Sequence, residues 1–182
     1  IAAELSSTRR VALLEMEAQP GYHSTGRSAA AFIPSYGVEC DVLRPLTLAS
    51  APFFQTNASG AVAVDFLKRR GLVTIASDGA VSDIPALCKA LSERIPGGVS
   101  PISRDQALAL LPSLKSGWSS SATYEPDVFD MDVDAIHQFF LAAARRHGGE
   151  LFCNAAVKGL NYVDGLWQGE TETRLFKART IV

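Results

Sequence analysis

Two groups of residues near the start of the chain have the types and spacing to bind a nucleotide. The apolar run "VALL" ends on the carboxylate of Glu15, and the polar segment Ser24-Thr25-Gly26-Arg27-Ser28 follows shortly afterwards. In dinucleotide-binding βαβ units, an acid at the end of the second strand accepts hydrogen bonds from ribose hydroxyls. Hydroxyl groups, backbone amides at the start of a helix and an arginine together favour a pyrophosphate. The alternative is an ordinary surface turn, in which Arg27 pairs with Glu17.

The glycine-rich turn that accompanies such an acid is expected about 20 residues before it. Counted back from Glu15, that turn would lie upstream of Ile1. The chain also begins without Met and ends on the apolar run "TIV". We therefore expect the sequence to be a piece of a longer protein.

Other polar residues allow competing interpretations. Asp127, Asp130, Asp132 and Asp134 carry oxygen ligands of the kind that bind Ca²⁺ or Mg²⁺, but their spacing differs from that of an EF-hand loop. An amphipathic helix is predicted directly after them, so helix capping is the preferred interpretation and no metal is expected. His137 falls on or beside the apolar face of that helix and is interpreted as a packed histidine.

Composition narrows the classes of function. The 182 residues are 47% hydrophobic and 20% charged, with a net charge of −2, which is typical of a globular chain and argues against nucleic-acid binding. Cys40, Cys88 and Cys153 are odd in number and far apart, so neither a disulfide framework nor a zinc site is predicted, and a cytoplasmic location fits. No apolar run approaches the ~20 residues of a membrane span, so no transmembrane segment is expected.

Apolar periodicity and turn residues predict the elements that must position these groups. In the first third we expect a helix over residues 2–6, a strand over 10–15, a loop over 19–25, a short helix over 26–32 and a longer helix over 41–57. In the longer helix Pro45 fits the first turn, whereas Pro52 should kink or end it. The middle of the sequence has a different pattern. We expect strands over residues 71–77 and 118–124, and helices over residues 83–95 and 104–112.

The last third again alternates helix and strand. An amphipathic helix over residues 133–147 follows Asp132 and stops at Gly148-Gly149. Strands are expected over residues 150–153, 156–163, 166–169 and 178–182, with a tight turn at Asp164-Gly165. The predicted fold class is therefore α/β, a dinucleotide-binding fold interrupted by an α+β piece on the substrate side.

Two stretches resemble a known family. "LLEMEAQPGYHSTGRSAAAFIPSYG" resembles the second strand and following loop of FAD-dependent oxidoreductases of the D-amino-acid oxidase and glycine oxidase superfamily, and is most similar to its D-arginine dehydrogenase-like members. "ATYEPDVFDMDVDAIHQFFLAAARRHGGELFCNAAVKGLNYVDG" resembles the return of that family to the FAD domain. The resemblance implies an incomplete Rossmann-like FAD-binding domain of glutathione-reductase type, in two segments (1–62 and 125–182), with an inserted α+β substrate or cap segment (63–124).

The same resemblance implies roles for individual residues around FAD. Glu15 would bind the ribose, Met16 would lie beside the adenosine, and the backbone of Val157 would meet the adenine. The alternative for Val157 is an ordinary strand valine. His23 is either a cofactor neighbour or an exposed loop residue. The residues that would follow the pyrophosphate toward the flavin ring are Ser24, Thr25, Gly26, Arg27, Ser28, Ala29 and Ala30.

Three positions are implied on the substrate side. Tyr36 matches a tyrosine that faces the substrate, although an aromatic residue before glycine is also common in packed turns. D-Arginine dehydrogenase-like members have a His after "GRSAA" and a Glu near the start of the middle strand, where this chain has Ala31 and Gly71. A pocket without that carboxylate should not favour arginine or lysine, because a buried cation without a partner is strongly disfavoured.

The activity implied by the resemblance is oxidation of an amino acid, in particular a D-amino acid. A hydride would pass from the substrate α-carbon to the flavin, giving an imine that water hydrolyses to a 2-oxo acid. The small-molecule substrate and the electron acceptor, oxygen or a quinone or other carrier, are left open, and no catalytic residue is assigned. Two alternatives remain: an FAD-dependent 2-hydroxy-acid dehydrogenase, and a non-catalytic nucleotide-binding fragment.

Overall fold

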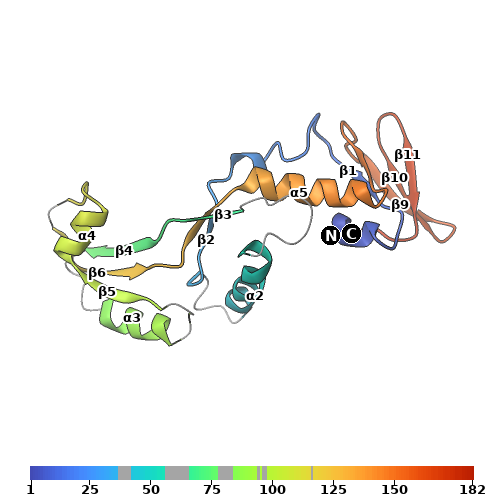
Figure 1. The fold of residues 1–182 in the computed structure, drawn as a ribbon. Helices are drawn as coiled ribbons and strands as arrows, with labels where there is room; N and C mark the ends of the chain where they lie inside the picture. The colour runs from blue at the N-terminus through green and yellow to red at the C-terminus, as the bar shows by residue number, and fades with distance from the viewer. Residues whose placement is uncertain (37–41, 56–65, 78–83, 94, 96–97, 116) are drawn as a thin grey trace. The chain divides into compact units, whose positions relative to one another are not determined.

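The computed structural model describes residues 1–36, 42–55, 66–77, 84–93, 95, 98–115 and 117–182. The chain forms two compact units, one made of residues 1–28 and 133–182 and the other of residues 29–132. Each unit has its own small sheets and helices (Figure 1). The division into segments 1–62, 63–124 and 125–182 concerns function and stays a prediction. In the described part of the chain, no helix has the length and apolar character needed to cross a bilayer.

The first unit is built on a pair of parallel strands from opposite ends of the sequence. Its elements are α1 (Ala2–Ser6), β1 (Ala12–Leu14), the 3₁₀ turn η1 (Thr25–Arg27), α5 (Val133–Arg146), β8 (Glu150–Phe152), β9 (Gly159–Val163), β10 (Leu166–Glu170) and β11 (Leu175–Ala178). β1 pairs with β8 in parallel, from Ala12 opposite Glu150 to Leu14 opposite Phe152. Both α1 and η1 pack against α5. The mixed α/β class predicted from the sequence is confirmed here.

Helix α5 has the amphipathic character that the sequence predicts. Leu141 and Ala144 are buried on one face. Gly148 adopts a φ of 79°, and the N–H of Gly149 donates to the carbonyl of Ala144 at 2.9 Å. This is the left-handed helix stop that glycine favours, so the predicted end of the helix is confirmed.

Strands β9, β10 and β11 form an antiparallel meander, coloured red in Figure 1. Asp164 and Gly165, between β9 and β10, both have positive φ, at 50° and 80°, which matches the type I′ turn of a two-residue hairpin. The strand predicted over residues 178–182 is wrong. β11 ends at Ala178, opposite Trp167, and the four residues after it are exposed. An apolar stretch therefore does not form a strand where no neighbouring strand continues to pair with it.

The second unit holds two antiparallel three-stranded sheets, ordered β2-β7-β3 and β4-β6-β5. Its elements are β2 (Ala31–Phe32), α2 (Leu43–Gln55), β3 (Leu67–Arg69), β4 (Leu72–Ser77), α3 (Ile84–Ser92), β5 (Ser100–Ser103), α4 (Arg104–Leu110), β6 (Trp118–Glu125) and β7 (Phe129–Met131). Ser103 and Gln106 form a reciprocal capping box at the start of α4, at the predicted position. Aromatic rings cluster around the first sheet: Phe32, Phe53, Phe54, Phe66 and Phe129.

Two predictions in this region are corrected. A short helix was expected over residues 26–32, but the helical turn ends at Arg27 and residues 31–32 form strand β2. Pairing of Ala31 with Asp130 outweighs the helical propensity of the alanines. Pro52 was expected to kink or end α2, yet the helix continues to Gln55. The bond that Pro52 cannot donate would reach back to the carbonyl of Leu48, and the loss of this one bond does not end the helix before its last turn is complete.

Candidate functional site

The backbone around Glu15 is fixed by the end of β8. The N–H of Glu15 donates to the carbonyl of Phe152 at 2.9 Å, and the N–H of Ala155 donates to the carbonyl of Glu15 at 2.8 Å. One carboxylate oxygen, Oε1, accepts the N–H of Glu17 at 2.9 Å. The carboxylate at the end of β1 is therefore held in a defined orientation, with its side chain only partly buried.

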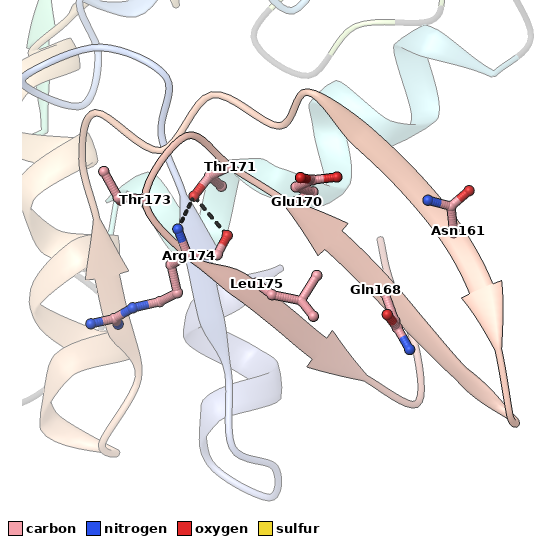
Figure 2. A pocket seen from close by; sticks show the side chains of 7 residues that line it. All are labelled: Asn161, Gln168, Glu170, Thr171, Thr173, Arg174 and Leu175. Carbon is pink, nitrogen blue, oxygen red and sulfur yellow. Dashed lines mark hydrogen bonds between the residues drawn. The ribbon is translucent and has the colours of Figure 1, made fainter.

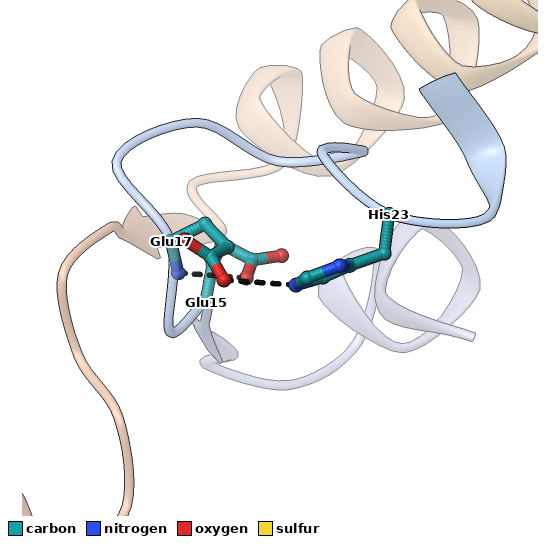
Figure 3. A network of polar contacts seen from close by, with 3 residues as sticks. All are labelled: Glu15, Glu17 and His23. Carbon is teal, nitrogen blue, oxygen red and sulfur yellow. Dashed lines mark hydrogen bonds and ion pairs between the residues drawn. The ribbon is translucent and has the colours of Figure 1, made fainter. Parts of the chain in front are cut away.

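Figure 3 shows the polar contacts that continue from Glu15 into the loop. Oε1 of Glu17 lies 2.8 Å from Nε2 of His23, and the two side chains are 29% and 59% exposed. Arg27 does not take this partner, and instead places its guanidinium 5.2 Å from the ring centroid of Tyr22. Because exposed ion pairs contribute about 0–1 kcal/mol, the His23–Glu17 contact orders the loop only weakly. The alternative pairing of Arg27 with Glu17 is thus replaced by a cation–π contact.

Two glycines let the loop close tightly on itself. The N–H of Gly26 donates to the carbonyl of Gly21 at 2.7 Å, and a Cβ at Gly26 would lie 2.3 Å from that oxygen. A Cβ at Gly21 would lie 2.9 Å from Cε1 of His137, so His137 packs on the loop, and its interpretation as a packed histidine is confirmed. The closed turn leaves an exposed polar series: Ser24, Thr25, Gly26, Arg27 and Ser28.

The structure brings the segment of Val157 next to Glu15 although the two are far apart in the sequence. The N–H of Asn154, a residue with a φ of 53°, donates to the carbonyl of Glu17 at 2.8 Å. Val157 follows shortly after, and its side chain is 48% exposed, while that of Met16 is 60% exposed. Large apolar side chains this exposed beside a carboxylate suit contact with a planar, partly apolar ligand.

The remaining predicted residues belong to the second unit. Ala29 is exposed, and the carbonyl of Ala30 accepts the N–H of Met131 at 3.0 Å. Ala31 lies in β2, and Tyr36 sits on a turn with its ring 64% exposed.

Gly71 is buried and has a φ of +78°. Its N–H donates to the carbonyl of Val128 at 3.0 Å. A Cβ at this position would lie 2.6 Å from the hydroxyl oxygen of Tyr124. The phenol of Tyr124 therefore occupies the space that any side chain at position 71 would need.

Gly71→Ala is expected to destabilise the protein by about 2 kcal/mol, from the left-handed backbone and the overpacking together. Chemical unfolding measures the loss. In a Tyr124→Ala background the added cost of Gly71→Ala should fall to about 1 kcal/mol, because only the backbone strain remains. An equal cost in both backgrounds would contradict the contact between Gly71 and Tyr124.

Two of the four aspartates, Asp127 and Asp130, pair with arginines. Asp127 lies 2.5 Å from Arg69, and Asp130 lies 2.9 Å from Arg70. Among the residues that the structure describes, no group of three or more histidine, cysteine or acidic side chains could hold a metal ion. Cys88 is buried, and burial raises the pKa of its thiol, which lowers the reactive thiolate fraction at neutral pH.

A hollow of about 450 Å³ lies on the β9–β11 meander. The sequence did not indicate it. Figure 2 shows the hydroxyl of Thr171 bonded to the backbone of Arg174 at the hairpin beside it. None of its described lining residues is among those predicted to bind FAD; they are Asn161, Gln168, Glu170, Thr171, Thr173, Arg174 and Leu175.

Glu125 was also not among the site residues predicted from the sequence. It is 3% exposed and accepts a hydrogen bond from the backbone of Ser35. The available signal was an ionisable residue at the last position of a strand, directly before Pro126.

The polar groups at the end of β1 and in the following loop fit a dinucleotide cofactor. The oriented carboxylate of Glu15 suits ribose hydroxyls, and the exposed hydroxyls and the cation of the loop suit a pyrophosphate. Gly26 carries no side chain, and the tight turn leaves no space for one at that position. The outer surface of the loop is exposed and therefore open to a ligand.

Comparison with solved structures shows the same fold. A glycine oxidase from Geobacillus kaustophilus is 20% identical with a TM-score of 0.77, over 98% of this chain and 50% of that one. L-α-Glycerophosphate oxidase from Mycoplasma pneumoniae, solved with FAD bound, is 13% identical with a TM-score of 0.78, over 95% and 46%. L-Amino acid deaminase from Proteus myxofaciens is 18% identical with a TM-score of 0.71, over 97% and 40%.

The chain thus spans about half the length, or less, of these solved structures. Its family is nevertheless identified over the whole sequence, and the cofactor of that family is FAD. Residues 1–182 match the family model of FAD-dependent oxidoreductases called DAO, and the chain belongs to this family.

Proposed function

We propose that the whole protein oxidises an amino acid, in particular a D-amino acid, with FAD as the electron acceptor in the active site. The observation that carries this proposal is the carboxylate of Glu15, held between the ends of β1 and β8 beside an exposed hydroxyl-rich loop. In this proposal residues 1–62 and 125–182 contribute to a Rossmann-like FAD domain, and residues 63–124 form an inserted segment on the substrate side. We also propose a cytoplasmic location.

The proposed roles follow from the chemistry of each group. Glu15 accepts hydrogen bonds from the ribose, Met16 and the backbone of Val157 contact the adenosine, and Arg27 neutralises pyrophosphate charge. His23 orders the loop through Glu17. The remaining FAD contacts are assigned to Ser24, Thr25, Gly26, Ser28, Ala29 and Ala30.

The cofactor supplies the chemistry when bound, by accepting a hydride from the substrate α-carbon. Water would then hydrolyse the imine product to a 2-oxo acid and ammonia. The electron acceptor of the whole protein would be oxygen, or a quinone or other carrier.

We propose a neutral substrate side chain. Gly71 provides no carboxylate, and Tyr124 fills the space beside it, while Ala31 offers no polar group. A cationic side chain would therefore lack a partner at these positions, which disfavours its burial. Preference for the D-enantiomer rests on the resemblance of the Glu15 to Tyr36 segment to D-arginine dehydrogenase-like proteins.

A 2-hydroxy acid is the second candidate substrate. One of the similar structures is L-α-glycerophosphate oxidase, and its name describes an oxidase whose substrate carries no amino group. Hydride transfer from carbon to FAD serves amines and alcohols alike.

The test starts with the visible absorption spectrum of the purified full-length protein and the release of FAD on denaturation. Anaerobic mixing with D-alanine, L-alanine, D-arginine and D-2-hydroxyglutarate then compares the rates at which the flavin bands bleach. Fastest bleaching by D-alanine is expected. Fastest bleaching by the hydroxy acid would select the second candidate. A colourless protein that cannot be reconstituted would leave the non-catalytic nucleotide-binding fragment.

A further inference from the structure

The second unit contains a buried carboxylate, that of Glu125, which has no role among the proposed cofactor contacts. Glu125, at the end of β6, is 3% exposed. Its Oε1 accepts a hydrogen bond from the N–H of Ser35 at a distance of 3.0 Å. Burying a carboxyl group is costly unless it is hydrogen-bonded, and the contact with the Ser35 N–H offsets part of that cost.

The hydrogen bond ties a rigid strand to a turn. Register pairing with Leu72 fixes Glu125 in the β4-β6-β5 sheet. The donor belongs to a turn in which the N–H of Tyr36 bonds to the carbonyl of Ile33 at 3.0 Å. Ser35 itself is half-buried, while the neighbouring Tyr36 ring is 64% exposed. The carboxylate therefore anchors the backbone directly beside an exposed aromatic side chain.

We infer that Glu125 is a positioning residue for substrate recognition, and that it acts through Tyr36. The inference rests on the proposed function and on the role that the family resemblance implies for Tyr36, which is to face the substrate. The acceptor oxygen is buried and fixed in the sheet, and leaving the Ser35 N–H without it would be costly, so Glu125 holds the Ser35–Tyr36 backbone in one place. A fixed backbone spares the substrate the cost of ordering the turn when it binds. Glu125 itself touches no substrate.

The first test compares Glu125→Ala and Glu125→Gln in the full-length protein. The alanine variant removes the acceptor for the Ser35 N–H, whereas glutamine keeps an oxygen in the same place. We expect Glu125→Ala to raise KM about tenfold, as the loss of the acceptor for a backbone N–H predicts, with kcat and FAD content unchanged. Glu125→Gln should restore most of the loss. Glu93→Ala, an exposed acid just after α3, is the matched control and should leave KM unchanged.

A double-mutant cycle separates positioning from general weakening of the fold. In a Tyr36→Ala background, Glu125→Ala should no longer change KM, because the residue that it positions is absent. An equal rise in KM in both backgrounds would overturn the inference. So would an unchanged KM in FAD-loaded Glu125→Ala.

A second readout needs neither FAD nor turnover. Hydrogen exchange of the peptide that contains Ser35 and Tyr36 should be about tenfold faster in Glu125→Ala than in the unsubstituted protein, and close to normal in Glu125→Gln. Unchanged exchange in Glu125→Ala would overturn the anchoring itself. If the anchoring is observed but the protein holds no FAD, the proposed function fails, and with it the substrate role assigned to the turn.

Discussion

Gly26→Ala is expected to abolish stable FAD loading and to destabilise the protein by about 3 kcal/mol, the upper end of ordinary overpacking costs. The new methyl group would lie 2.3 Å from the carbonyl oxygen of Gly21. That oxygen belongs to backbone, so the clash cannot be relieved by rotating a side chain. The loop must open and lose the 2.7 Å hydrogen bond from Gly26 to Gly21, which displaces the hydroxyls on either side.

Thermal unfolding and the ratio of flavin to protein absorbance measure the two effects in the full-length protein. Gly169→Ala in β10 is the matched control, because a Cβ there meets no atom within 4 Å. It should leave both quantities unchanged. A Gly26→Ala protein that is as stable and as yellow as the unsubstituted protein would show that the loop does not close as described.

Glu15→Gln is expected to weaken FAD binding about 10- to 100-fold, the range for loss of hydrogen bonds to a charged group. The substitution keeps the size of the side chain and an oxygen that can accept the Glu17 N–H. It removes the charge and replaces the other oxygen, which would accept the ribose hydroxyls in the proposed role, with an NH2 group that can only donate. Because the local turn is preserved, the effect should fall on FAD affinity, with little change in the free energy of unfolding of the apoprotein.

Titration of the apoprotein with FAD, followed by quenching of flavin fluorescence, provides the affinities. Glu17→Gln serves as the control on the same loop. Its partner His23 is 59% exposed, so its loss should change FAD affinity by no more than roughly threefold. If the two glutamine variants bind FAD equally, Glu15 has no special role at the ribose.

The sequence predicted well those features that depend on local chemistry. Helix α5 and its glycine stop, the start of α4 at Arg104 and the turn at Asp164-Gly165 all follow from residue types a few positions apart. The end of β1 at a carboxylate was also readable, because strand and acid are contiguous.

The features that the sequence did not predict depend on distant partners. Ala31 and Phe32 form a strand only because β7 lies beside them. The anchoring of Ser35 by Glu125, and the phenol of Tyr124 over Gly71, join residues from separate strands and turns. Local propensity carries no information about such neighbours, and the assignment of single residues to FAD came from the resemblance.

The parallel pairing of β1 with β8 has a consequence for the order of folding. Nearly the whole chain separates Leu14 from its partner Phe152, and contacts between such distant residues form late because loop closure costs entropy first. Residues 29–132 are continuous and can collapse while the ribosome is still adding α5 and β8. During that interval β1 lacks its partner β8, and the turn that carries Glu15 lacks the backbone hydrogen bonds to Phe152 and Ala155. We therefore expect the nucleotide-facing loop to be among the last parts of the molecule to mature.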